Sequence, residues 1–182
     1  MKGREKHRIP RLGLVIAASI FIGSLSYSRA DQNTPSADKK YTLGTIISFG
    51  AGGGSERFKA SGWSNPEPQF TWTEGKGATV SVELASGETA LTLRMKLVGL
   101  VHPPELSSQP VELYVNGRKL ADWQVMGPDN FTATIPKDVA AAKKLEIELR
   151  TPKSTTPKAL KMNDDARVLG VACFEMEIQK QS

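Results

Sequence analysis

A chain of 182 residues with a single cysteine, Cys173, cannot form an internal disulfide. Its 24 Lys and Arg outnumber its 19 Asp and Glu, which gives a formal net charge of +5. Six of the 24 basic residues and one of the 19 acidic residues lie within residues 1–30, so 18 of each remain beyond that segment. A domain with no net charge lacks the basic surface that nucleic-acid binding requires, and we expect no nucleic-acid partner.

Residues 1–30 have the features of a secretory signal peptide. The first eleven residues carry five basic side chains, and Leu12 to Leu25 is uncharged, mostly apolar and short for a bilayer span. Ser28 and Ala30 place small residues at −3 and −1 of a cut before Asp31. We therefore predict a periplasmic or secreted protein. The alternative is an uncleaved N-terminal anchor, which would be its one contact with a membrane.

Residues 31–40 are polar, contain Pro35 and predict a flexible linker, which leaves residues 41–180 for one domain. Apolar residues within Tyr41 to Phe49 predict a first strand. Gly50 to Gly54 has neither the lysine nor the following helix of a phosphate-binding loop, so we interpret it as a flexible loop.

The segment from Phe58 to Pro68 reads as a turn-rich loop, and three alternating strands follow it, at residues 70–73, 79–84 and 91–97. In the first of these, Phe70 and Trp72 share one side of the strand, and we expect that side to face the core.

Residues 111–125 predict a β-hairpin. Apolar and polar residues alternate on both arms, and Asn116-Gly117 between them tolerates the positive φ angles of a type I′ turn. The pattern places Trp123 in the core and Tyr114 on the polar face.

Residues 131–135 predict another strand, 136–144 a short helix, 145–150 a strand, 151–166 a polar loop and 167–179 the last strand. In this last strand we expect Cys173 to be buried and Phe174 to share the apolar face with Met176 and Ile178. The sum is an all-β, antiparallel two-sheet β-sandwich of eight or nine strands, jelly-roll-like in the first instance. An immunoglobulin-like sandwich is the second choice and an up-and-down barrel the third.

Catalytic and metal-binding residues are scarce, so we predict a protein that is not an enzyme and has no cofactor. His102 is the one histidine beyond residue 30 and lies in a predicted loop, and no nucleophile or zinc-protease motif is present. Asn163-Asp164-Asp165 offers oxygen ligands but lacks the spacing of a calcium loop, so no metal is expected. The paired strand carboxylates read as solvated surface; they are Glu146, Glu148, Glu175 and Glu177.

Two segments resemble a known domain. They are Gly62-Trp63-Ser64-Asn65-Pro66-Glu67 with Trp72-Thr73 behind it, and Asp165-Ala166-Arg167-Val168-Leu169-Gly170. Together with the Val-Asn-Gly hairpin they resemble an uncharacterised β-sandwich domain found at the ends of bacterial membrane glycosyltransferases and envelope polysaccharide proteins. This resemblance implies a carbohydrate-related accessory role rather than a catalytic one.

We expect Arg167 to pair with Asp165 or Glu67, because an arginine fork can hold a carboxylate and fix a loop. The predicted ligand-binding residues are Trp63, Glu67, Asp165 and Arg167 at one end of the sandwich, with Tyr114 as an exposed aromatic platform. The predicted function is a noncatalytic module that binds carbohydrate or associates with envelope polysaccharide. The alternatives are a structural or protein-interaction module that docks an envelope protein, and a hydrolase whose carboxylates would have to meet across a cleft.

Overall fold

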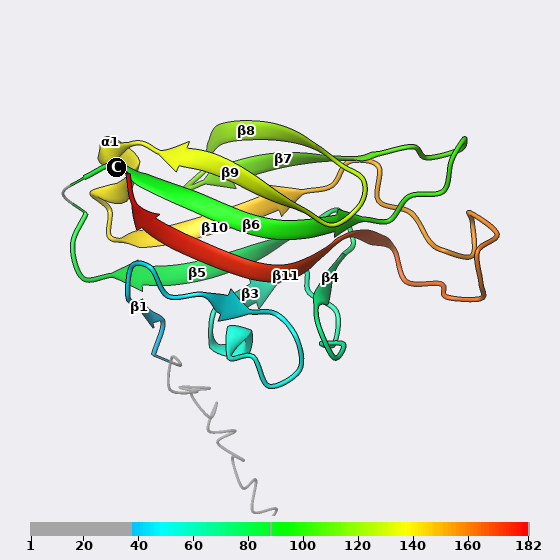
Figure 1. The fold of residues 1–182 in the computed structure, drawn as a ribbon, viewed down its shortest axis with the longest axis horizontal. Helices are drawn as coiled ribbons and strands as arrows, with labels where there is room; N and C mark the ends of the chain where they lie inside the picture. Colours follow the sequence, from blue (N-terminus) through cyan, green and yellow to red (C-terminus); the bar gives the residue numbers. More distant parts are fainter. Residues whose placement is uncertain (1–37, 88, 182) are drawn as a thin grey trace, which may run out of the picture. The chain divides into compact units, whose positions relative to one another are not determined.

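A computed structural model describes residues 38–87 and 89–181, which form two β-sheets packed face to face (Figure 1). Each sheet has one apolar face, and packing the two faces together removes both from water. The predicted two-sheet β-sandwich is therefore confirmed. The predicted signal peptide lies outside the described residues, as does most of the linker. Among the helices of the described residues, none has the length and hydropathy needed to cross a membrane.

The first sheet has the strand order β1-β5-β10-β7-β8, with β3 also pairing β5. Its pairs are antiparallel except for β1 and β5, which are parallel. The strands are β1 (Lys40–Tyr41), β3 (Lys59–Ser61), β5 (Gly77–Leu84), β7 (Gln109–Val115), β8 (Arg118–Val125) and β10 (Lys144–Arg150).

The second sheet has the order β2-β11-β6-β9, with β4 also pairing β11, and all of its pairs are antiparallel. In Figure 1 this sheet lies in front of the first. Its strands are β2 (Ile47–Ser48), β4 (Thr71–Glu74), β6 (Leu91–Gly99), β9 (Asp129–Ile135) and β11 (Leu169–Lys180). Two short helical turns complete the described part: η1 (Ser55–Arg57) and α1 (Lys137–Ala140).

From β4 onward the chain alternates between the sheets, with the β7–β8 hairpin as the one local pair. This alternation gives the fold its jelly-roll-like character. The described residues contain eleven strands rather than the eight or nine expected. The excess comes from β1, β2 and β3, which have two or three residues each and are too short to show a period in the sequence.

The prediction of one strand over Tyr41 to Phe49 is wrong. The segment instead contributes β1 to the first sheet and β2 to the second. A turn separates them, in which Thr45 N–H donates to Thr42 O at 3.1 Å and Gly44 adopts φ 84°. Because this left-handed conformation favours glycine, the chain leaves the strand direction here and crosses the edge of the sandwich.

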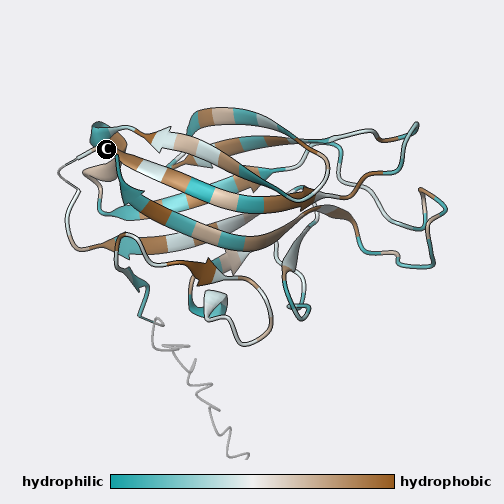
Figure 2. Cartoon of the chain, in the orientation of Figure 1, coloured by the Kyte–Doolittle hydropathy of each residue, from teal (hydrophilic) through white to brown (hydrophobic). Residues whose placement is uncertain are grey.

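The core is built from alternate residues of the long strands. Leu91, Leu93, Met95 and Leu97 of β6 are fully buried, and Figure 2 shows the alternating hydropathy along this ribbon. The hairpin forms as predicted, with φ 49° at Asn116 and 79° at Gly117.

Two other predicted core residues are also buried. Trp123 is 8% exposed and stacks at 5.4 Å on Phe131. Burial raises the pKa of the Cys173 thiol, which keeps it protonated and unreactive.

The prediction that Phe70 and Trp72 face the core is wrong. Thr71 and Thr73 are the buried residues of β4. The Thr71 hydroxyl donates to Phe49 O at 2.6 Å, and the Thr73 hydroxyl accepts from Val171 N–H at 3.0 Å. Because both hydroxyls are satisfied by backbone groups, their burial costs little. The aromatic side chains of this segment consequently point away from the core.

Gln109, at the start of β7, is fully buried, and neither atom of its amide has a hydrogen-bond partner among the described residues. Burying an unpaired amide is unfavourable, so Gln109→Met is expected to raise the free energy of unfolding by about 1–3 kcal/mol. Urea denaturation measures this change. Gln124→Met in β8, where the side chain is exposed, is the control. A loss of stability in Gln109→Met would contradict the expectation.

Candidate functional site

Three aromatic side chains gather on the outer face of the second sheet, the face turned away from the core. Trp72 belongs to β4, Phe70 is the residue just before that strand, and Phe174 belongs to β11. The Phe70 ring lies 5.8 Å from Trp72 and 5.2 Å from Phe174, in edge-to-face geometry. We call these three residues the aromatic patch.

The position of Phe174 depends on a β-bulge. Cys173 pairs with Leu97 and Glu175 pairs with Lys96, so Phe174 is an extra residue with no partner on β6. Cys173 and Met176 on either side of this step are both fully buried, whereas Phe174 and Glu175 are only partly buried. The expectation that Phe174 shares the face of Met176 and Ile178 is therefore wrong.

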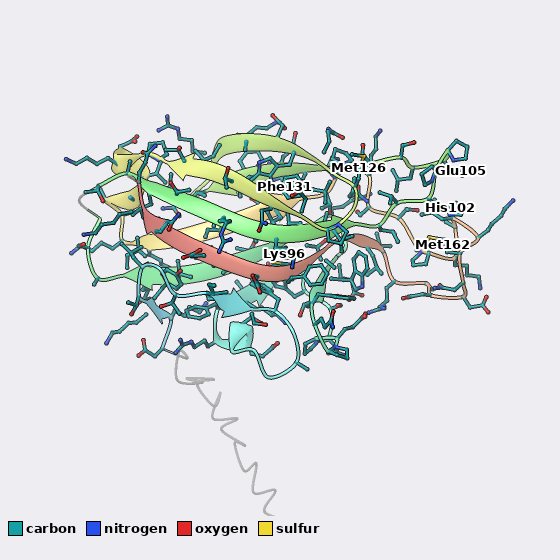
Figure 3. The ribbon with its side chains drawn as sticks, viewed as in Figure 1. Lys96, His102, Glu105, Met126, Phe131 and Met162 are labelled. Carbon is teal, nitrogen blue, oxygen red and sulfur yellow. The ribbon has the colours of Figure 1, made fainter. Side chains whose placement is uncertain are left out.

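Charged and amide groups adjoin the aromatic patch. Lys96 of β6, labelled in Figure 3, places its ammonium 5.5 Å from the centroid of the Phe174 ring. Register pairing sets Lys96 between Glu175 on β11 and Asn130 on β9. Two residues earlier on β6, the Arg94 guanidinium donates two hydrogen bonds to one carboxylate oxygen of Glu177, at 2.7 and 3.2 Å. Ile46, Met176 and these five polar residues line a shallow depression.

The predicted cluster of Glu67, Asp165 and Arg167 forms. The Arg167 guanidinium donates to both oxygens of Asp165 at 2.7–3.2 Å, and it approaches Glu67 at 3.6 Å. The Arg167 backbone N–H also donates to Asp165 at 2.9 Å. These hydrogen bonds hold the pKa of Asp165 below its ordinary value of 3.8. The predicted pairing is confirmed, and it ties the loop containing Glu67 to the approach to β11.

Trp63 is half-buried at the edge of the sandwich. Its indole N–H donates to Thr79 O at 2.8 Å, and its ring lies 4.9 Å from Phe49. The preceding Gly62 has φ 73°, and a Cβ there would lie 2.0 Å from Gly77 O, so the loop is seated tightly on β5. A hollow of about 240 Å³ opens beside Trp63, lined by Glu56 and residues 59–66.

Tyr114 lies on the outer face of the first sheet, apart from the other four predicted residues, which belong to the loops beside β4 and β11. The Arg150 guanidinium lies 3.9 Å from the centroid of its ring, and its hydroxyl is 3.5 Å from Glu112. One face of the predicted platform is therefore covered. A ligand-binding role for any of the five residues stays a prediction, and the aromatic patch was missed because its members were assigned to the core.

The described residues contain no group of three or more His, Cys, Asp and Glu side chains placed to hold a metal ion. Three of the four strand carboxylates flagged in the sequence are ion-paired at 2.7–3.0 Å: Glu146 with Lys144, Glu148 with Arg150, and Glu177 with Arg94. The reading of these three as strand surface agrees with this arrangement.

No protein-family model and no curated protein sequence matches this chain. Solved structures with a similar fold include carbohydrate-binding modules. One is the CBM36-1 domain of a multidomain xylanase from the hindgut metagenome of Trinervitermes trinervoides, with 13% identity and a TM-score of 0.46, covering 76% of this chain and 98% of that one. Another is a CBM36 module in complex with calcium and xylotriose, with 12% identity and a TM-score of 0.42, covering 74% of this chain and 99% of that one.

A family 6 carbohydrate-binding module has 11% identity and a TM-score of 0.45, covering 79% of this chain and 98% of that one. Likeness at this level does not transfer a ligand or a site.

Replacing Trp63 tests whether it is a structural residue. Trp63→Ala removes the stacking on Phe49 and the hydrogen bond to Thr79, and it is expected to lower the free energy of unfolding by about 3 kcal/mol. Trp63→Phe keeps an aromatic ring but loses the N–H bond, and about 1 kcal/mol is expected. Urea denaturation of both variants measures the two losses of stability. Unchanged stability in Trp63→Ala would show that the indole does not support the fold.

The Asp165–Arg167 pair predicts a pH dependence. A lowered native pKa means that the ionised carboxylate stabilises the fold. Its contribution is fully present above the ordinary aspartate pKa and is lost as the pH falls through the native value. The Tm difference between wild type and Asp165→Asn should therefore be largest at neutral pH and shrink in acid. Thermal melts across this range measure it, with the exposed neighbour Asp164→Asn as control. A difference independent of pH would contradict the assignment.

Proposed function

We propose that this protein is a noncatalytic carbohydrate-binding module that holds its glycan on the outer face of the second sheet. The aromatic patch is the observation that carries the proposal. Its three rings lie on the solvent side of β4 and β11, where the core does not require them. Clustered aromatic residues on an otherwise polar surface are typical of binding sites.

The chemistry of the face suits a sugar. A sugar ring has an apolar C–H face, which packs on an aromatic side chain, and hydroxyl groups at its rim, which need hydrogen-bond partners. Lys96 and Asn130 offer donors, while Glu175 and Asn130 offer acceptors, all beside the patch. Neither Lys96 nor Glu175 takes part in an ion pair within the described ranges, so both heads keep their hydrogen-bonding capacity for a ligand.

The source of the glycan follows from the predicted signal peptide. A protein exported to the periplasm or cell exterior meets envelope and extracellular polysaccharides, and the resemblance to domains at the ends of membrane glycosyltransferases points to the same material. We propose envelope polysaccharide as the ligand. A face with three aromatic residues also suits an envelope protein partner, since aromatics are enriched in such interfaces. Sugar binding is preferred because hydrogen-bonding heads surround the patch.

The first experiment is a glycan-array screen of the domain, followed by calorimetry on the glycans that bind. Trp72→Ala and Phe70→Ala are each expected to weaken binding tenfold or more, equal to about 1.4 kcal/mol, because each removes part of the platform. Tyr114→Ala is the matched control. It removes a partly buried aromatic from the outer face of the other sheet and should leave affinity unchanged.

Thermal melts accompany each variant, so that loss of fold is separated from loss of binding. Weakening by Tyr114→Ala, with Trp72→Ala and Phe70→Ala unchanged, would move the site to the first sheet. Absence of binding to every bacterial polysaccharide on the array would overturn the carbohydrate proposal and favour the protein-interaction alternative.

A further inference from the structure

Beyond the aromatic patch, the outer face of the second sheet continues as three rows of polar side chains. The rows follow from the antiparallel register of β11, β6 and β9, which sets one residue from each strand side by side. They are Glu175, Lys96 and Asn130; then Glu177, Arg94 and Thr132; then Gln179, Thr92 and Thr134. We call these three rows the track. Each of these nine residues is partly or fully exposed.

The rows make the face long. Lys96 and Thr92 are four residues apart on β6, which spans about 13 Å at 3.3 Å per residue. Val98, paired with Ala172 beside Trp72, extends the same line by two residues to about 20 Å. A surface of this length exceeds one sugar ring and accommodates several in a line.

The face is also open. Side chains fill the depression along Arg94 and Lys96, which has a cavity volume of about 0 Å³, so the rows form a surface rather than a pocket. A closed pocket selects the end of a chain, whereas an open track lets the chain continue past both ends. Ile46 is 52% exposed beside the middle row and supplies a second apolar contact partway along the track.

The charges on the track balance. Lys96 and Arg94 face Glu175 and Glu177, and Arg94 is neutralised by its hydrogen bonds to Glu177. The third row consists of two threonines and a glutamine, which are neutral and both donate and accept. An acidic chain would meet as many carboxylates as cations here, so the track favours a neutral one.

From this length, openness and charge balance we infer that the face binds the interior of an extended, uncharged oligosaccharide chain, several sugar units at a time. The aromatic patch holds one sugar, and the polar rows hold the units that follow it. This inference rests on the proposed function and names its ligand class and mode of binding.

The test is calorimetry with oligosaccharides of the uncharged polysaccharides that bind on the array, and with cello- and manno-oligosaccharides, each from the monosaccharide to the hexasaccharide. In the series that binds, the association constant should rise with each added unit until the track is filled. Oligosaccharides blocked at both ends should bind as tightly as unblocked ones of equal length. Oligogalacturonate of the same length should bind at least tenfold more weakly.

A paired variant at the far row locates the track. Gln179→Ala with Thr134→Ala is expected to weaken binding of the hexasaccharide about threefold to tenfold while leaving the disaccharide unchanged. Glu146→Ala on the outer face of the first sheet is the control and should alter neither. Thermal melts verify that each variant is folded.

The two proposals fail in different ways. A monosaccharide that binds as tightly as the hexasaccharide, with both lost in Trp72→Ala, would overturn the chain-interior inference and leave a carbohydrate-binding patch. Loss of binding on blocking one chain end, or preference for oligogalacturonate, would likewise overturn it. Absence of any binding in all series, together with a blank glycan array, would instead overturn the proposed function itself.

Discussion

The register between β6 and β11 is the constraint on which the rest of the structure depends. The two strands pair along almost their whole length, so every side chain of one has a fixed neighbour on the other. One face of this pair supplies Leu93, Met95 and Ile178 to the core. The other face carries the polar rows. The single shift at Phe174 changes the face on which that residue lies without disturbing the pairing on either side, and so joins an aromatic side chain to a polar surface.

The lower edge of the sandwich in Figure 1 is closed by a second set of interactions, and these determine the orientation of β4. Lys59 has a side chain only 8% exposed, and its ammonium donates to Glu56 at 2.7 Å and to the Thr71 hydroxyl at 2.9 Å. The same hydroxyl donates to Phe49 O. A threonine can serve both partners here and an aromatic ring cannot, so Thr71 lies inside and the rings beside it lie outside.

The parts of the fold that could be predicted are those determined locally. The β7–β8 hairpin follows from Asn116-Gly117, and Asp165 and Arg167 meet because two residues along one loop are always near each other. The aromatic patch could not be predicted. Alternation in β4 shows that its two faces differ, but which face is buried depends on partners such as Phe49 and Val171, far away in the sequence. The bulge at Phe174 leaves no local signal, and an apolar residue in an apolar run reads as core.

The long-range contacts that place the aromatic patch on the outer face also suit it to binding. Hydrogen bonds of the buried Thr71 and Thr73 hydroxyls fix the position of β4. Trp72 lies between these two threonines in the sequence, and Phe70 directly precedes the first. Phe174 is fixed by ladder pairing on both sides of the bulge. Side chains held in this way lose little conformational freedom when a ligand arrives, so more of the contact energy remains as affinity. A rigid group of aromatic side chains built into a sheet is therefore better suited to a stiff, extended chain than a mobile loop would be.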